Sequence, residues 1–110
     1  MRWRVSEEKV LALIQEYFPE AKLAAGSGNV HHDGDQIGIP GVYVDTKDQS
    51  KNKGHSVKAS EWEKAAEQAS KEHPPREPMI VTVNKDGEVM AHCKLDLLLL
   101  ALSYVPKGVL

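Results

Sequence analysis

Residues 42–47 read VYVDTK, and this alternation of apolar and polar side chains decides the expected fold. Successive side chains on a β-strand point to opposite faces of the sheet, so Asp45 and Lys47 lie together on one face. The two valines and the threonine lie on the other face. The pattern therefore predicts a strand with one apolar face and one face that carries charge.

A helix is expected before this strand, over residues 6–18. Ser6 followed by Glu7 and Glu8 is typical of a helix start, because serine caps the first turn and acidic side chains suit the helix dipole there. The apolar residues that recur at helical spacing before Pro19 are Val10, Leu11, Ile14, Tyr17 and Phe18.

A second helix is expected after the polar stretch at residues 48–58, which resembles a surface loop and is the most basic part of the chain. Residues 60–63 read SEWE, a capping box that begins a helix. A narrow stripe of mostly small residues follows, formed by Trp62, Ala65, Ala66 and Ala69. Such a stripe suits a helix that lies close on a sheet.

A hairpin is expected after the proline-rich breaker at residues 73–78. The nearly continuous apolar run 79–83 predicts a buried strand, the sequence NKDG at 84–87 predicts a turn, and the run 88–92 predicts the return strand.

The last expected element is a helix over residues 97–104, capped by Asp96. Its side chains are apolar nearly all round, which predicts burial in the core or against a second subunit. The order of helices and strands predicts a single α/β domain over residues 1–110, with a central mixed sheet flanked by helices.

The composition agrees with one domain and limits its partners. The chain has 110 residues, of which 41% are hydrophobic and 27% are charged, enough for a single core. A formal charge of −2 argues against general coating of nucleic acid or membrane, so a polyanion site must be a local patch. The single cysteine, Cys93, excludes an intrachain disulfide and a cysteine-built zinc site, and we expect a buried structural thiol.

No membrane partner is expected. The longest apolar run, residues 97–102, is far shorter than the ~20 residues of a spanning helix. No basic-then-apolar signal segment opens the chain, so we expect a cytoplasmic protein of a bacterial, archaeal or phage-infected cell.

Asp35 is the residue that can complete a site with Asp45 and Lys47. If the connection is an odd-length loop such as Ile39-Pro40-Gly41, Asp35 lies opposite Asp45 on the same face, and an even loop turns it away. We predict the odd loop. Two converging carboxylates repel each other, and a hard divalent cation removes that penalty, so the pair predicts a Mg²⁺ site.

Lys47 and a helix acid fit the same chemistry. A bound metal promotes attack of water on a phosphodiester, and the Lys47 ammonium can orient that water or stabilise the transition state. Glu7 shares a helix face with Val10 and so lies at the edge of the core-facing stripe, while Glu8 points more nearly to solvent. We therefore select Glu7 as a third acid, although a first-turn charge is an equally good explanation for it.

With these features the chain resembles the PD-(D/E)XK nuclease superfamily, and within it the small archaeal and phage Holliday-junction resolvases. The resemblance covers the order of elements along the whole chain: a helix acid, the Gly-Ser-Gly segment at 26–28, Gly34-Asp35, the Asp45-x-Lys47 doublet, a helix and a hairpin. It implies a restriction-endonuclease-like core. Gly34 stands where the family has proline, and Asp45 stands where Glu is commoner.

The resemblance also implies roles for the matching residues. Glu7, Asp35 and Asp45 would be metal ligands, and Lys47 would be catalytic. The residues expected to contact the DNA backbone are Ser27 and Asn29 in the glycine-containing segment, and Lys51, Lys53 and Lys58 in the basic loop.

Several neighbouring residues have weaker cases. Asp33 is a reserve ligand, since it lies two residues before Asp35. His31, His32 and His55 could contact phosphate or transfer a proton, but each is better explained as a loop residue near the rim of the site.

The expected function is a metal-dependent endodeoxyribonuclease that is structure-selective for branched DNA such as Holliday junctions. It would use Mg²⁺, with Mn²⁺ as a substitute, and work as a homodimer, as the resemblance and the apolar last helix both suggest. The alternatives are a non-catalytic DNA-binding or assembly subunit that retains the nuclease fold, and an interaction domain unrelated to nucleic acid with an acidic surface cluster.

Overall fold

The structure is a computed structural model that describes the backbone of residues 2–23, 35–37 and 39–110, and the side chains of residues 5–23 and 39–110. Its elements in chain order are α1 (Arg2–Gln15), β1 (Lys22–Leu23), β2 (Asp35–Ile37), β3 (Val42–Gln49), α2 (Ala59–Ser70), β4 (Glu77–Asn84), β5 (Val89–His92) and α3 (Leu95–Ser103).

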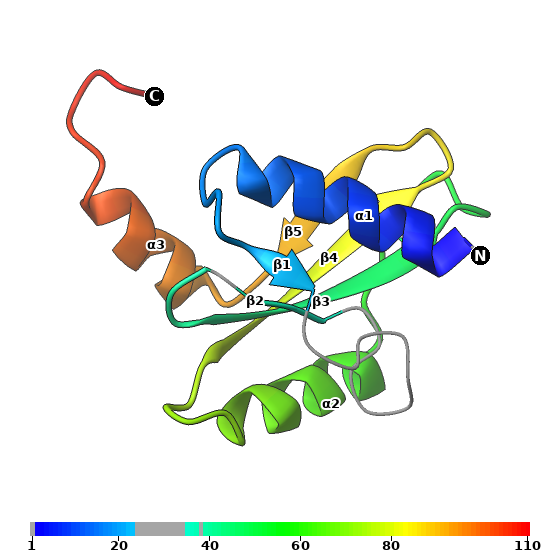
Figure 1. The fold of residues 1–110 in the computed structure, drawn as a ribbon, viewed down its shortest axis with the longest axis horizontal. Helices are drawn as coiled ribbons and strands as arrows, with labels where there is room; N and C mark the ends of the chain where they lie inside the picture. The colour runs from blue at the N-terminus through cyan, green and yellow to red at the C-terminus, as the bar shows by residue number, and fades with distance from the viewer. Residues whose placement is uncertain (1, 24–34, 38) are drawn as a thin grey trace.

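The described strands form one five-stranded mixed sheet in the order β1-β2-β3-β4-β5. β3 and β4 are parallel, and the other neighbouring pairs are antiparallel. The parallel pair requires a crossover, which α2 provides. α1 and α2 cover opposite faces of the sheet, as Figure 1 shows. The predicted α/β fold with a central mixed sheet between helices is confirmed.

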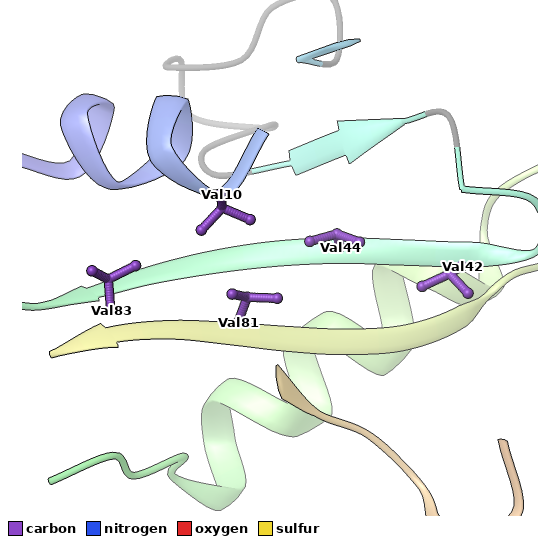
Figure 2. Close-up of a cluster of buried hydrophobic side chains, with 5 residues drawn as sticks. All are labelled: Val10, Val42, Val44, Val81 and Val83. Carbon is purple, nitrogen blue, oxygen red and sulfur yellow. The ribbon is translucent and has the colours of Figure 1, made fainter. Parts of the chain in front are cut away.

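The core lies between α1 and the sheet. Val10 of α1 packs against Val42 and Val44 of β3 and Val81 and Val83 of β4, as Figure 2 shows. All five side chains are less than a tenth exposed. The valines of β3 and β4 lie on the same face because their strands pair with Val44 opposite Met79 and Thr46 opposite Val81.

The opposite face of β3, which carries Asp45 and Lys47, is covered by α2. The Tyr43 hydroxyl donates a hydrogen bond to Oε1 of Gln68 on α2. All residues from Val42 to Thr46 are buried. The small side chains of Ala65 and Ala69 on α2 are almost fully buried, which confirms the predicted close packing of this helix on the sheet.

α1 begins and ends earlier than the predicted range of 6–18. It spans Arg2–Gln15, so Ser6 is a buried residue inside the helix and not its cap, and Glu7 is not a first-turn acid. The chain tightens into turns after Gln15, with the amide of Phe18 donating to the carbonyl of Ile14, and Pro19 follows.

The caps of α2 and α3 also differ from prediction. The N-cap of α2 is Lys58, whose amide donates to the Glu61 carboxylate at 2.9 Å, so the helix starts before Ser60. The N-cap of α3 is Lys94, and Asp96 lies in the first turn of that helix. β4 starts at Glu77, two residues before the expected run, because its first residues pair with β3.

α3 is not part of the core, so that half of the prediction for the last helix is wrong. None of its residues is buried, and Leu97 alone among its leucines packs partly against the valine cluster. In Figure 1 the helix lies at one end of the sheet, away from α1 and α2.

Candidate active site

β2 and β3 bring two aspartates opposite each other. The register pairs Asp35 with Asp45 and Gln36 with Val44. Residues directly opposite in an antiparallel pair lie on the same face, with Cβ atoms about 4.5–5.5 Å apart. The predicted odd-length connection is confirmed by this register.

The connection owes its geometry to Pro40 and Gly41. The amide of Val42 donates to the carbonyl of Ile39, which closes a four-residue turn. Gly41 has a φ of +76°, a conformation that a side chain would strain, and proline before it has the fixed φ that the preceding turn position needs. The turn therefore fixes the register that places Asp35 opposite Asp45.

Lys47 completes this part of the site. Its ammonium nitrogen lies 3.4 Å from Oδ2 of Asp45, and the side chains are 29% and 10% exposed respectively. The carboxylate is thus held in a largely dry position beside a cation that solvent or substrate can still reach. Asp45 and Lys47 share the face of the sheet that α2 covers, because Tyr43 precedes Asp45 by two residues and contacts α2.

Glu7 is not brought to the same face. It is 1% exposed and lies one helical turn before Val10, so it faces the sheet on the α1 side. Regular pairing of β3 with β4 puts Val44 on that side and Asp45 on the other. The sheet therefore separates the Glu7 and Asp45 side chains. Glu8 is exposed, as expected.

The basic loop between β3 and α2 is anchored to its surroundings. Nδ2 of Asn84 donates to the carbonyl of Lys53 at 2.7 Å, and the amide of Lys85 donates to the carbonyl of Asn52 at 2.8 Å. The Gln49 side chain exchanges two hydrogen bonds with the backbone of Ser56, at 2.6 and 3.1 Å.

The three lysines of this loop keep their side chains in solvent. Lys51, Lys53 and Lys58 are all exposed. Fixed backbone and free ammonium groups are what a phosphate-binding segment needs, because less conformational freedom is lost on binding.

A histidine cluster lies beside Lys47 and was not expected as a unit. Thr82 of β4 is opposite Lys47 in the sheet and is fully buried. Its hydroxyl lies 2.6 Å from Nδ1 of His55 and 2.9 Å from Nε2 of His92. Nε2 of His55 lies 3.1 Å from the Glu88 carboxylate. No sequence motif predicts this cluster, because His55 lies far from Thr82, Glu88 and His92 in the chain and a single threonine in a strand carries no functional signal.

His92 has a lowered pKa in the folded protein. Its partial burial disfavours the charged imidazolium, and the neighbouring His55 adds a smaller repulsion in the same direction. The imidazole of His92 therefore favours the neutral form and can accept or donate a hydrogen bond at Thr82 according to its tautomer.

Some predicted residues fall outside the described part of the chain. These are Ser27, Asn29, His31, His32 and Asp33, and the side chain of Asp35. Among the described side chains, no three His, Cys, Asp or Glu residues form a metal-binding group. Cys93 is half-buried.

Two surface hollows lie elsewhere on the described part of the molecule. One, of about 490 Å³, is lined by Tyr17, Phe18 and Pro40, and the other, of about 380 Å³, by Ser6, Asp48 and neighbouring residues. Neither of these two hollows is lined by Asp45 or Lys47.

Comparison with known proteins found no match to this chain. No family model, curated protein or solved structure matches the chain. Among the described helices, none has both the length and the apolarity needed to cross a bilayer.

Proposed function

We propose that this chain is a metal-dependent endodeoxyribonuclease that hydrolyses DNA phosphodiesters, with branched DNA such as a Holliday junction as its substrate. The observation that carries the proposal is the register of Asp35 opposite Asp45, with the Lys47 ammonium 3.4 Å from the Asp45 carboxylate. The order of acids and lysine on paired strands is the one that the resemblance to PD-(D/E)XK nucleases requires.

The donor set fits Mg²⁺, with Mn²⁺ as a substitute. Carboxylate oxygens on neighbouring strands are the ligands that hard divalent cations prefer. Asp35 and Asp45 would hold the ion, which when bound would polarise the scissile phosphate and promote ionisation of a water. Glu7 was expected as a third ligand, but it lies on the other side of the sheet, so we do not assign it this role.

Lys47 has two functions in the proposed reaction. Its ammonium offsets part of the charge of two adjacent carboxylates, which lowers the cost of holding them together. The same group is exposed enough to orient an attacking water or to stabilise negative charge on the phosphate in the transition state.

The exposed lysines of the basic loop would bind the DNA backbone. Lys51, Lys53 and Lys58 follow the catalytic strand directly and belong to a loop that is anchored next to it. Phosphate contacts supply affinity without reading sequence, which agrees with an enzyme that recognises DNA shape. Such an enzyme would act in the cytoplasm, where its substrate lies.

We further propose that the working form is a homodimer joined through α3. Five leucines of this helix are 40–65% exposed: Leu95, Leu98, Leu99, Leu100 and Leu102. Contiguous apolar surface of this kind is rare on monomers and marks an interaction site. Asp96 is the only charged residue within Leu95–Ser103, so the helix lacks the basic residues that DNA or a membrane surface would require.

A cleavage assay tests the catalytic proposal. The unmodified chain is incubated with a synthetic four-way junction or a matched duplex in Mg²⁺, Mn²⁺ or EDTA. We expect metal-dependent cleavage that prefers the junction, and loss of cleavage in Asp45→Asn and Lys47→Met with the circular dichroism spectrum unchanged. Binding of junction DNA with no cleavage in any metal would instead favour a non-catalytic DNA-binding subunit, and neither activity would favour an interaction domain.

A further inference from the structure

We propose that His55 is a positioning residue that holds the basic loop against the sheet in the geometry needed for DNA binding. The inference rests on the proposed function and concerns the surface next to the same site. It is carried by the contacts of one side chain that belongs to the loop but packs inside the domain.

The imidazole of His55 is held at both nitrogens. Nδ1 lies 2.6 Å from the Thr82 hydroxyl and Nε2 lies 3.1 Å from the Glu88 carboxylate, and the side chain is only 8% exposed. A loop residue with its ring buried between two partners fixes the backbone on either side of it. Those neighbours are the segment that carries Lys53 and leads to Lys58.

The anchor point is a rigid part of the sheet beside the proposed catalytic pair. Thr82 is fully buried in β4 and pairs with Lys47 of β3. Strands in one ladder lie about 4.8 Å apart, so a loop fastened to Thr82 is fastened next to Lys47. A DNA strand whose phosphates contact the loop would then lie within reach of Lys47 and Asp45.

His92 provides a control for the role of His55, because it belongs to the same cluster but not to the basic loop. His92 contacts the same hydroxyl at 2.9 Å but belongs to β5, so its loss leaves the bond from His55 to Thr82 in place. A threonine hydroxyl has one proton and can donate to only one of the two rings. Removing His92 therefore removes one contact of the cluster, whereas removing His55 removes two, those to Thr82 and Glu88, and only His55 connects the loop.

The test compares His55→Ala, His55→Asn and His92→Asn with the unmodified chain. Binding to a fluorescent four-way junction in EDTA is measured over a series of salt concentrations, and cleavage is measured in Mg²⁺. Hydrogen exchange at the Ser56 amide, which donates to the Gln49 side chain, reports on the loop itself. The asparagine variant keeps an amide near the position of Nδ1 and should restore part of the contact with Thr82.

We expect His55→Ala to speed exchange at Ser56 and to weaken junction binding by roughly 3- to 10-fold, the size of about one net hydrogen bond, because the second contact is to the exposed Glu88 carboxylate and adds little. The slope of affinity against salt should stay unchanged because all lysines remain, whereas Lys53→Ala should lower that slope by about one. The rate at saturating DNA should stay within about twofold, and His55→Asn should bind more tightly than His55→Ala. If His55→Ala does not fold, the comparison of His55→Asn with His92→Asn decides.

Equal weakening of DNA binding in His92→Asn and in the His55 variants would overturn the inference. DNA binding would then depend on the stability of the histidine cluster and not on the position of the basic loop. Unchanged binding in the His55 variants would overturn it as well. Failure of the unmodified chain to bind DNA would refute the proposed function and with it the DNA role of the loop, and Ser56 exchange would still show whether His55 holds the loop.

Discussion

The substitution Asp35→Asn should change the thermal stability of this protein in opposite directions with and without Mg²⁺. Like charges directly opposite in an antiparallel pair destabilise a sheet by about 0.2–1 kcal/mol. Asp35 and Asp45 occupy such a position, and the Asp45–Lys47 contact at 3.4 Å offsets part of the repulsion. In EDTA, therefore, the variant should melt higher than the unmodified chain by roughly 1–6 °C.

Adding Mg²⁺ should reverse the order. An ion that binds only the folded chain stabilises it by about 1.4 kcal/mol at ten times its dissociation constant, which raises the midpoint by roughly 5–10 °C. Asp35→Asn lacks one of the two carboxylates and should gain much less. The asparagine has nearly the same volume as the aspartate, so packing should not contribute.

The assay is thermal unfolding by circular dichroism, in EDTA and over a Mg²⁺ titration. Asp86→Asn is the control, because Asp86 is an exposed residue of the β4–β5 turn and lies beyond Asn84, where the pairing of β4 with β3 ends. The reasoning is refuted if Asp35→Asn melts below the unmodified chain in EDTA, or if Mg²⁺ shifts both chains equally.

Three further predictions test other parts of the site and fold. Glu7→Gln should keep cleavage within about tenfold of the unmodified rate in the junction assay, whereas a fall beyond the roughly 10–100-fold typical of residues that only support a metal ligand would contradict its placement across the sheet from Asp45. Since folding lowers the pKa of His92 from 6.5, its contribution to stability is complete above about pH 6.5 and is lost as the pH falls through the folded value. Urea unfolding between pH 7.5 and 5 should show this loss, and His92→Asn should reduce it. Leu99→Lys should convert a dimer to a monomer in sedimentation velocity. The control Tyr17→Lys changes a side chain that is 79% exposed but lies outside α3, and it should leave the dimer intact. A monomeric unmodified chain would contradict the proposed dimer.

The elements of the fold were largely readable from local patterns. Alternation over residues 42–47 predicted β3, and the small stripe after residue 60 predicted a helix that packs closely on the sheet. Element ends were less predictable because they depend on contacts. Ser6 has the chemistry of a cap, yet it lies inside α1, where packing against the sheet outweighs its capping preference.

The sequence by itself determined which residues can share the proposed site on β2 and β3. Period-two alternation puts Asp45 beside Lys47, and the Pro40-Gly41 turn has the backbone preferences that set Asp35 opposite Asp45. These relations are local, since each depends on neighbours in one hairpin.

Only the tertiary structure decided what covers each face of that hairpin. It placed α1, with Glu7, on the valine face and α2 on the face of Asp45, and it joined His55 to Thr82 and His92 from distant parts of the chain. It also left the leucines of α3 outside the core. Apolar periodicity predicts that a helix buries one face, but it does not predict the surface against which that face packs. That surface depends on how all the elements pack together.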